Sequence, residues 1–425
     1  MKISIKPSVL SGQINAKPSK SYEQRLLAGV LLSGGNCIIS NCGNSDDVVA
    51  ARTIIETLGC NIITEKNILK ISSSDISGNN VINCNESALC ARLFTPIACL
   101  LKSKFIVTGN NTLLNRPVAD GFEIFKAMGS DLSYKDNKLP VEFSNAVIKS
   151  GKYTIDGSKT SQLISGLIMA LSAVNGNSQL IIENPASIDY INLTINILKN
   201  FDINCHVEIC QQNNLIVNII GNQNYKPGSF ETENDWSSAS PILVAGALCG
   251  NISIKGLNKY SVQADKNILN VFDLANVNYS WKNDILTVKR SETKAFEFNA
   301  VNCPDLIPPI VVLALFTKGA SKIHGAGRLL HKESSRGEVL LKELQKIGAD
   351  ISISDDIIEI TGKKEYNTAI LDSYNDHRIA MALSVAGLKI NNGIEIKNPE
   401  CIKKSYPEFY EDLKTLNANI ALSCD

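Results

Sequence analysis

Cationic side chains stand at the start of a predicted helix near the N-terminus of the chain. Lys20 and Arg25 flank the entry to the apolar segment 26–32, and Ser21 followed by Gln24 matches a capping box. A helix N-terminus already carries partial positive charge and unpaired N–H donors, so a cation there costs roughly 0.3–1 kcal/mol. An anion bound between the two side chains would offset this cost. The stretch therefore predicts a binding site for a negatively charged group.

Cations and hydrogen-bond donors recur at the starts of further predicted helices. A surface cation or an ordinary helix cap is the usual explanation for any one of them. As a set they indicate pockets for phosphate or carboxylate, because helix N-termini, guanidinium groups and hydroxyls all donate to anions. The sequence has neither a P-loop nor a dinucleotide-binding glycine motif, so it does not predict a nucleotide held in that way. The residues are Arg92, Arg116, Thr160, Ser161, Gln162, Lys332, Arg336, Arg378, Lys403 and Lys404.

Carboxylates beside these cations could carry protons in a reaction. Asp305 precedes an apolar helix in "CPDLIPP", and Glu333 lies between Lys332 and Arg336. A carboxylate among cations stays ionised, and bound anions or exclusion of water raise its pKa toward values suited to general acid–base catalysis. Two simpler interpretations stay open, with Asp305 as a helix cap and Glu333 as a partner of the helix dipole. Asp376, in "YNDHR", could equally cap its helix.

The composition describes a globular chain without an overall charge. It has 425 residues, 44% of them hydrophobic, and 42 Lys and Arg balance 42 Asp and Glu. Such a chain is long enough for two or three domains and offers no general basic field for nucleic acid or an anionic membrane. The first residues lack a secretory signal, and the longest apolar runs fall short of the ~18 residues of a membrane span. We therefore expect a cytoplasmic protein that binds neither nucleic acid nor a membrane. Its 12 cysteines contain no CxxC pair, so we expect them to be reduced and buried.

The helices with cationic starts belong to a sequence unit that recurs along the chain. Six copies share one plan: strand, polar elbow, apolar helix, strand, second helix and β-hairpin, or βαβαββ. The first helix of each copy is apolar almost all round, which predicts burial, and the second is amphipathic, which predicts an outer position. Six copies divide most simply into two lobes of three, with the polar stretch 222–235 between them. A repeat scaffold without chemistry has the same architecture, but it gives no reason for cations at one class of helix start.

Motifs spread over nearly the whole chain resemble those of the EPSP synthase family, the 3-phosphoshikimate 1-carboxyvinyltransferases. In order they are "KPSKSYEQR", "ESALCAR", "NRPVADG", "IDGSKTSQ", "PASIDY", "CPD", "KESSR", "YNDHRIAM" and "KKSYPEF". The resemblance implies an α/β (α+β) fold, a two-lobed inside-out α/β barrel in which each lobe has three βαβαββ repeats with inner and outer helices. It places residues 15–228 in the lobe on the shikimate 3-phosphate side, and residues 1–14 plus 229–425 in the lobe on the phosphoenolpyruvate and acid/base side. The active site would lie in the cleft between the lobes.

The resemblance also implies two substrates and the residues that bind them. Shikimate 3-phosphate would contact Lys20, Ser21, Arg25, Thr160, Ser161, Gln162, Ser187, Asp305 and Lys332, with Tyr190 along its ring. Phosphoenolpyruvate would contact Lys20, Arg116, Gln162, Arg336, Arg378 and Lys404, with the turn at Ala88 against it. Arg92, Arg328 and Asp376 complete the expected substrate-binding set. The family's chemistry requires no metal and no organic cofactor, and a monomer is its usual form.

In the reaction that the resemblance implies, the 5-hydroxyl of shikimate 3-phosphate adds to C2 of phosphoenolpyruvate while C3 gains a proton. The tetrahedral adduct then expels phosphate and leaves 5-enolpyruvylshikimate 3-phosphate, on the route to chorismate and the aromatic amino acids. Asp305 fits the base, Glu333 fits the proton donor to C3, and Lys20 assists proton transfer at the bridging or leaving oxygen. These roles could also be exchanged or shared among the three residues.

Ala88 and Arg328 are among the positions that depart from the family pattern. Ala88 stands where members commonly have Gly, and its methyl group would press on the phosphoenolpyruvate site. We therefore expect reduced sensitivity to glyphosate, which occupies that site, at some cost in phosphoenolpyruvate affinity. Arg328 stands where Asn is frequent, which leaves its role as a ligand open.

Two other functions stay open from the sequence. The enolpyruvyl transferase that acts on UDP-N-acetylglucosamine shares the fold and the chemistry, but it resembles this chain less at "KPSKS". It also uses a loop cysteine as proton donor, whereas Cys90 and Cys99 fall within a predicted helix. A non-catalytic repeat protein that only binds anionic metabolites would have no need of Lys20, Asp305 and Glu333 together.

Overall fold

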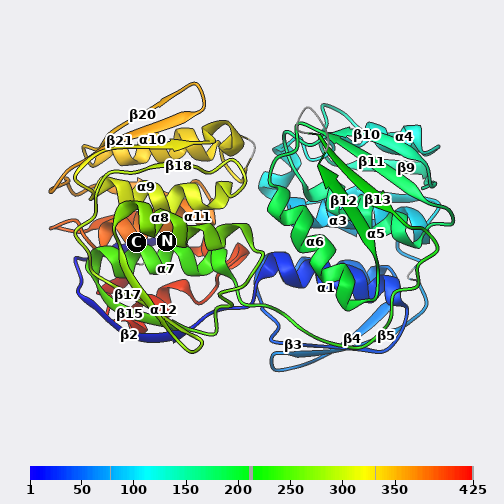
Figure 1. Ribbon diagram of the computed structural model, residues 1–425, viewed down its shortest axis with the longest axis horizontal. Coiled ribbons are helices and arrows are strands. Elements are labelled where there is room, and N and C mark those ends of the chain that lie inside the picture. The colour runs from blue at the N-terminus through cyan, green and yellow to red at the C-terminus, as the bar shows by residue number, and fades with distance from the viewer. Residues whose placement is uncertain (77, 210–213, 331, 424–425) are drawn as a thin grey trace. The chain divides into compact units, whose positions relative to one another are not determined.

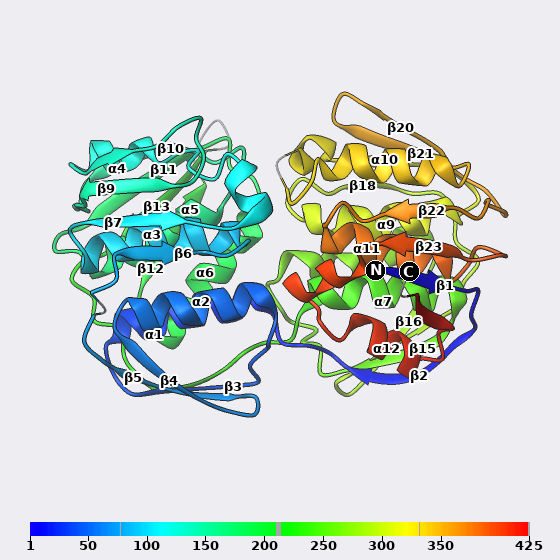
Figure 2. The same cartoon turned by 180° about the vertical axis from the view of Figure 1, so that it is seen from behind.

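The computed structural model describes residues 1–76, 78–209, 214–330 and 332–423. The chain forms two compact units: unit 2 comprises Pro18–Glu233, and unit 1 comprises Met1–Lys17 and Asn234–Asp425. Unit 1 therefore contains both the first strand and the last helices of the chain (Figures 1 and 2). We expected the lobes to change after residues 14 and 228, a few residues before these boundaries.

Unit 2 is built from three sheets, among the residues that the structure describes, with helices between their strands. The sheet orders are β14-β3-β5-β4, β6-β7-β9-β8 and β10-β11-β13-β12. The helices are α1 (Lys20–Ser33), α2 (Asp46–Thr57), α3 (Ala88–Leu101), the 3-10 helix η1 (Asn111–Asn115), α4 (Glu123–Ala127), α5 (Gln162–Ala173) and α6 (Ile188–Asn200). The strands are β3 (Cys37–Ser40), β4 (Cys60–Glu65), β5 (Ile68–Ser73), β6 (Val81–Asn83), β7 (Phe105–Thr108), β8 (Asp131–Ser133), β9 (Val141–Asn145), β10 (Lys152–Asp156), β11 (Ser178–Glu183), β12 (Cys205–Ile209), β13 (Leu215–Ile219) and β14 (Ser229–Glu231).

Unit 1 has the same kind of architecture over its described residues. Its sheet orders are β22-β23-β1-β24, β16-β17-β15-β2 and β18-β19-β21-β20. The helices are α7 (Trp236–Cys249), η3 (Ala264–Asn267), α8 (Ile268–Ala275), η4 (Pro304–Leu306), α9 (Ile307–Leu315), η5 (Ala326–Leu329), α10 (Arg336–Lys346), α11 (His377–Gly387), η6 (Pro399–Lys404) and α12 (Phe409–Thr415). The strands are β1 (Lys2–Ile5), β2 (Leu10–Asn15), β15 (Gly250–Lys255), β16 (Asn278–Lys282), β17 (Ile285–Lys289), β18 (Glu297–Asn299), β19 (Gly319–His324), β20 (Asp350–Ser354), β21 (Ile357–Gly362), β22 (Ile370–Asp372), β23 (Ile394–Lys397) and β24 (Ile420–Ser423).

One pairing plan recurs in all six sheets, which confirms the βαβαββ unit. A parallel pair such as β18 and β19 is followed by an antiparallel hairpin such as β20 and β21, whose second strand inserts next to the parallel pair. The N-terminal strand β1 completes the last sheet, because it pairs antiparallel with both β23 and β24. It occupies the position that β21 holds in its own sheet.

Strands that open the first and fourth copies pair far from their own helices. β2 pairs parallel with β15, and β14 pairs parallel with β3. β14 consequently belongs to unit 2, whereas a boundary after residue 228 assigns it to the other lobe. The difference arises because the hydrogen bonds of β14 go to a strand near the beginning of the chain, and nothing in its own three residues signals that partner.

The first helix of each copy is buried and the second packs by one face, as the sequence predicts. In unit 2 every residue of α3 from Ala88 to Cys99 is buried, and α1 and α5 are buried over comparable lengths. In unit 1 the same holds for α7, α9 and α11. Figures 1 and 2 show α1, α3 and α5 between the strands β3–β5 on one side and β9–β11 on the other. The polar starts of the inner helices are therefore held by an apolar interior.

The predicted capping box at the first helix is wrong. α1 begins at Lys20, with Ser19 as its N-cap residue. Gln24 does not reach back to the helix start, because its side-chain amide donates to the Asp47 carbonyl at 2.8 Å and to the Ser87 hydroxyl at 3.3 Å. Hydrogen bonds to residues distant in sequence therefore hold the Gln24 side chain, which the capping-box rule assigns to the helix start.

Two other predicted helix starts are also corrected. Arg116, expected at the start of a helix, instead precedes turns over residues 118–122, and α4 begins at Glu123. Lys332 lies outside α10, which begins at Arg336.

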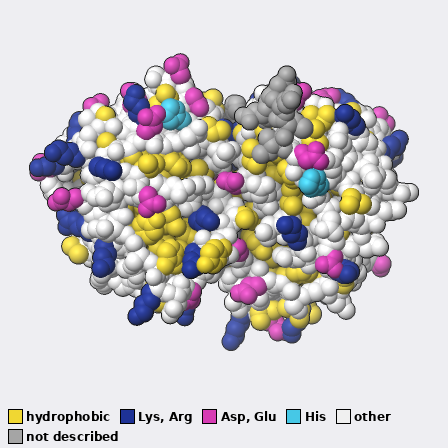
Figure 3. Space-filling model, in the orientation of Figure 1, with side chains coloured by type: hydrophobic (Ala, Val, Ile, Leu, Met, Phe, Trp, Pro, Cys, Tyr) yellow, Lys and Arg dark blue, Asp and Glu magenta, His cyan; other side chains and the backbone are white. Residues whose placement is uncertain are grey.

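The surface and the cysteines agree with the composition. Over the described residues, no helix has both the length and the apolar character needed to cross a bilayer. On the face shown in Figure 3, Lys and Arg side chains are interspersed with Asp and Glu. The ten described cysteines are free thiols, and most are buried.

Candidate functional site

In unit 2, the first helix presents Lys20 to a carboxylate of the second helix. The Nζ atom of Lys20 lies 2.7 Å from Oδ2 of Asp47, and both side chains are largely buried. Asp47 is in the first turn of α2, where the helix dipole favours an acid. The Lys20 side chain is thus held at the start of α1 by a residue of α2 rather than by a residue of its own helix.

Arg25 is buried and its guanidinium is held by protein groups. Nε donates to the Thr194 hydroxyl at 2.8 Å, Nη1 to the Ser21 carbonyl at 2.8 Å and Nη2 to the Ser165 hydroxyl at 3.2 Å. The guanidinium carbon also lies 5.9 Å from the centre of the Tyr190 ring. Burial lowers the pKa of Arg25 to about 10, so the side chain stays charged at neutral pH. Arg25 therefore joins α1, α5 and α6 and contributes a fixed positive charge.

Arg92 ties the start of α5 to the turn after η1. Its Nη1 donates to Oε1 of Gln162 at 2.9 Å, while Nε and Nη2 donate to the carbonyls of Val118 at 3.0 Å and Pro117 at 3.1 Å. Burial, and then the charge of the nearby Arg116, lower the pKa of Arg92 to about 9. The geometry makes Arg92 a support for Gln162, a residue expected to bind substrate.

Except for Arg116, the other predicted residues of unit 2 lie at the starts of α1, α3, α5 and α6. Ala88 is the first residue of α3 and is 5% exposed, behind the N-cap residue Ser87. The Thr160 hydroxyl accepts from the backbone N–H of Gln162 at 3.1 Å, so Thr160 takes part of the capping role. Positions expected to bind substrate here are Ser21 near the start of α1, Arg116 after η1, Ser161 as N-cap residue of α5, and Ser187 and Tyr190 at the start of α6.

In unit 1, Arg336 is the centre of a cluster of carboxylates. It is 1% exposed, at the first position of α10. Nε donates to Oδ2 of Asp376 at 2.9 Å and Nη1 to Oδ1 of Asp305 at 2.9 Å, while Nη2 donates to Glu333 and to Asp376. Burial opposes the charge, but the three carboxylates outweigh it and raise the pKa of Arg336. One guanidinium thus holds both predicted acid–base residues.

Asp305 lies among three cations. Besides Arg336, Arg378 Nη2 donates to its Oδ2 at 3.4 Å, and Lys332 Nζ is 3.6 Å from its Oδ1. Burial acts to raise the pKa of Asp305, yet Lys332, Arg378 and Arg336 together hold it well below its usual range. Asp305 is therefore ionised and able to accept a proton, and it does not act as a simple helix cap.

The start of α11 supplies Asp376 as both a cap and a charge partner. It is the N-cap residue, its Oδ1 accepts from the Arg378 backbone N–H at 2.9 Å, and the Ser334 hydroxyl donates to its Oδ2 at 3.0 Å. The expected cap is confirmed by this geometry. The carboxylate also orients Arg336, so one residue links two predicted anion-binding helix starts.

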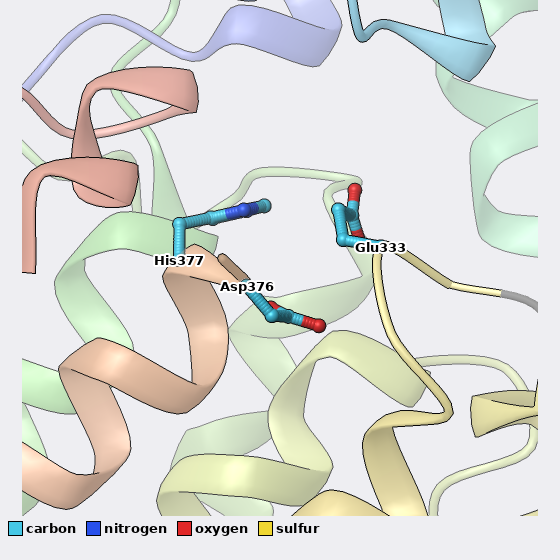
Figure 4. Close-up of side chains that lie close together, drawn as sticks. All are labelled: Glu333, Asp376 and His377. Carbon is cyan, nitrogen blue, oxygen red and sulfur yellow. The ribbon is translucent and has the colours of Figure 1, made fainter. Parts of the chain in front are cut away.

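Glu333, Asp376 and His377 offer atoms within 4.8 Å of one another, close enough to hold a metal ion. Figure 4 shows Glu333 on the loop before α10 and the other two at the start of α11, with the side chains of His377 and Glu333 extending toward one another. Arg336 already donates to both carboxylates. Its guanidinium therefore supplies the positive charge that a cation would bring.

Lys404 and Arg328 complete the predicted set in unit 1. Lys404 ends η6, is 5% exposed and donates to the Asn375 carbonyl at 2.8 Å. Arg328 lies in η5, and burial lowers its pKa while Asp305 opposes the shift. Its charge also acts on Lys332. Arg328 is thus close enough to the cluster to contribute positive charge to it.

Several partners of the site were not predicted from the sequence. They are Asp47, Ser165, Thr194, Ser237 and Asp265. Each belongs to an element far along the chain from the residue that it contacts. For Asp47 and Ser237 the repeat itself was the available signal, because polar residues in the first turns of corresponding helices indicate neighbouring positions.

Unit 2 thus concentrates cations and hydroxyls at converging helix starts, which suits the binding of anionic groups. Unit 1 combines cations with an ionised carboxylate and a second one beside it, which suits proton transfer on an anionic substrate. Comparisons with known proteins bear on which reaction this is. Residues 5–413 match the family model described as EPSP synthase (3-phosphoshikimate 1-carboxyvinyltransferase).

Similar proteins carry the same description. The 3-phosphoshikimate 1-carboxyvinyltransferase of Clostridium perfringens (strain SM101 / Type A) is 34% identical over 421 residues, with 98% of each chain covered. That of Clostridium acetobutylicum is 34% identical over 425 residues, again with 98% of each chain covered. A solved structure of EPSP synthase from Acinetobacter baumannii has a TM-score of 0.82 to this chain at 20% identity, covering 100% of both. This likeness confirms the predicted fold class, an inside-out α/β barrel with six four-stranded mixed sheets.

Proposed function

This chain belongs to the EPSP synthase family, and from that premise we propose a division of labour between its two units. The chain transfers the enolpyruvyl group of phosphoenolpyruvate to shikimate 3-phosphate, a step of aromatic amino acid biosynthesis. In the proposal, unit 2 binds mainly shikimate 3-phosphate, and unit 1 binds mainly phosphoenolpyruvate and supplies the two acid–base carboxylates. Lys20 and Arg116 of unit 2 assist with phosphoenolpyruvate. Each unit contributes its own set of helix starts to substrate binding.

Asp305 is the base toward the 5-hydroxyl in this proposal. The single observation that carries the assignment is the trio of cations around Asp305, which keeps it ionised. Phosphoenolpyruvate brings its own carboxylate and phosphate. When those groups bind Arg336 and Arg378, they share the positive charge that stabilises the ionised form of Asp305. The pKa of Asp305 then rises toward that of a useful base.

Glu333 is the proton donor to C3 of phosphoenolpyruvate. It shares Nη2 of Arg336 with Asp376 and lies on the loop directly before α10. Protonation of C3 and attack of the hydroxyl at C2 then use two different carboxylates held by one guanidinium. Lys20, fixed on Asp47, assists at the bridging or leaving oxygen.

The remaining residues position charge. Arg116, Arg378 and Lys404 neutralise phosphoenolpyruvate, and Lys332 neutralises the phosphate of shikimate 3-phosphate. Holding both substrates in one orientation replaces a bimolecular encounter with an oriented addition, which contributes to the rate together with charge stabilisation. The residues expected along shikimate 3-phosphate are Ser21, Arg25, Thr160, Ser161, Gln162, Ser187 and Tyr190.

The proposal assigns the reaction to side chains alone, without a metal or an organic cofactor. It further includes a monomer in the cytoplasm, with the two small substrates as its partners. Light scattering on the purified chain tests the monomer. A dimer in solution would contradict that part without affecting the assignments of Asp305 and Glu333.

Conservative replacement of each carboxylate tests the acid–base assignment. Asp305→Asn and Glu333→Gln keep size and polarity but cannot exchange the proton, so phosphate release should fall about 10²–10⁴-fold in each. Glu338→Gln is the matched control, because Glu338 is exposed on the same segment. Incorporation of deuterium from D₂O at C3 should be lost in Glu333→Gln. Wild-type rates in either site variant would refute the corresponding role.

A further inference from the structure

A further buried carboxylate, Asp265, lies close to the Asp305 cluster. It is in η3 and is 1% exposed. Its Oδ2 accepts a hydrogen bond from the hydroxyl of Ser237, in the first turn of α7. Its Oδ1 is buried without a hydrogen-bond partner among the described residues. An ionised carboxylate is costly in such a place, because burial removes its hydration and only one oxygen is compensated.

Ser237 connects Asp265 with the acid–base residues. Its hydroxyl donates to Asp265, while its backbone carbonyl accepts from Nη1 of Arg378 at 2.9 Å. Nη2 of the same guanidinium donates to Asp305 at 3.4 Å, a longer bond than the 2.9 Å one from Arg336. We propose that Asp265 is a positioning residue that sets, through Ser237 and Arg378, how firmly this guanidinium is held against Asp305.

The charge of Asp265 determines whether the Arg378 guanidinium interacts mainly with Asp305 or is also attracted to Asp265. The charged groups that act on Asp265 are Asp305 on η4, Arg378 on α11 and Asp235, the N-cap residue of α7. Burial first, and then the charge of Asp305, raise the pKa of Asp265 to about 7, against the opposing effects of Arg378 and Ser237. When Asp265 is protonated and neutral, Arg378 interacts with Asp305 alone of these two carboxylates. The ionised form competes for the guanidinium and weakens its hold on Asp305.

The inference rests on the proposed roles of Asp305 as the base and of Arg378 in neutralising phosphoenolpyruvate. It predicts a loss of activity at alkaline pH, because an Arg378 side chain drawn toward ionised Asp265 is no longer positioned for phosphoenolpyruvate. For the wild type, kcat/KM for phosphoenolpyruvate should fall about tenfold per pH unit above an apparent pKa near 7. Asp265→Asn keeps an acceptor for Ser237 but cannot ionise, so this alkaline limb should disappear. Ser237→Ala removes a hydrogen bond that lowers the pKa of Asp265, so the limb should move to higher pH.

Asp273→Asn on α8 is the matched control. Asp273 is exposed and accepts from the Tyr279 hydroxyl at 2.9 Å, so the replacement makes the same chemical change away from the cluster. Its pH profile should match that of the wild type. An unchanged alkaline limb in Asp265→Asn, or an equal loss of activity at every pH, would overturn the proposal. If Asp265→Asn does not fold, the Ser237→Ala variant provides the test. A shift of its alkaline limb to higher pH supports the proposal, and no shift or a shift to lower pH overturns it.

Stability tests the titration of Asp265 without reference to the reaction. Folding raises the pKa of Asp265, so its contribution is fully present below the unfolded value and is lost as the pH rises through about 7. The asparagine variant has no such loss, and its urea midpoint relative to the wild type should rise between pH ~5 and pH ~8. A constant difference would show that Asp265 does not titrate there. Failure of Asp305 as the base would instead appear as an active Asp305→Asn enzyme.

Discussion

At the scale of single residues, the acid–base site depends on the guanidinium of Arg336. Its three nitrogens face the carboxylates of Asp305, Glu333 and Asp376. A buried charge cluster of this kind contributes little net stability when complete, but removing one partner leaves the others uncompensated. The residue is therefore sensitive to substitution in both folding and catalysis.

Arg336→Met removes this charge while keeping an unbranched side chain. Three carboxylates then remain close together without their common cation, so the free energy of unfolding should fall by about 3–5 kcal/mol. Urea unfolding measures the change. Lys342→Met, on the exposed face of the same helix, is the control and should be near neutral. A loss below ~1 kcal/mol in Arg336→Met would show that the cluster does not depend on this cation.

Ala88 carries the prediction about glyphosate. The residue is nearly fully buried at the first position of α3, where an added or removed methyl group changes the space at the helix start. Ala88→Gly should bind glyphosate and phosphoenolpyruvate more tightly. Inhibition curves at several phosphoenolpyruvate concentrations measure both effects. If the wild type is inhibited as strongly as the glycine variant, the methyl group has no influence on this site.

Residue types and spacing predicted which cations matter, but not what holds them. Arg25 and Arg92 were expected to bind substrate, and the structure adds that their guanidinium nitrogens donate to protein groups. Asp47 and Asp265 were not predicted. Each of these residues pairs with a side chain on another element, and the spacing of residues within one element does not reveal such a pair.

At the scale of elements, the pattern of apolar residues predicted the buried inner helices well because burial requires an unbroken apolar surface. Helix starts were less predictable. Ser21 and Gln24 satisfy a local capping rule, yet Gln24 donates to α2 and α3 in the folded chain. A cap is worth about 1 kcal/mol, which tertiary hydrogen bonds readily outweigh.

The close approach of α3 and α5 offers a test at this scale. A Cβ atom on Gly166 would lie 2.6 Å from the Leu93 carbonyl oxygen and 2.7 Å from that of Arg92. Gly166→Ala should therefore push the helices apart, lower stability by about 1–3 kcal/mol and disturb the bond between Arg92 and Gln162. Thermal unfolding and the KM for shikimate 3-phosphate measure the two effects.

The control for this substitution is Gly337→Ala in α10. Its Cβ atom would meet Ile353 at 3.5 Å, an ordinary contact, so the alanine should be tolerated. Equal behaviour of the two alanine variants would contradict the account of the α3–α5 packing.

At the scale of the whole molecule, the six repeats were visible in the sequence, whereas the strand exchange was not. β1 completes the last sheet of unit 1, and β14 joins the first sheet of unit 2. Strands of three or four residues have too little sequence to specify a distant partner. The resemblance to the family supplied the position of the N-terminal strand, but not that of β14.

The most direct test of the account is phosphate release from phosphoenolpyruvate by the purified chain, with and without shikimate 3-phosphate. UDP-N-acetylglucosamine serves as the alternative acceptor. The account predicts release that depends on shikimate 3-phosphate and none with the nucleotide sugar. Release only with UDP-N-acetylglucosamine, or with neither acceptor, would contradict it.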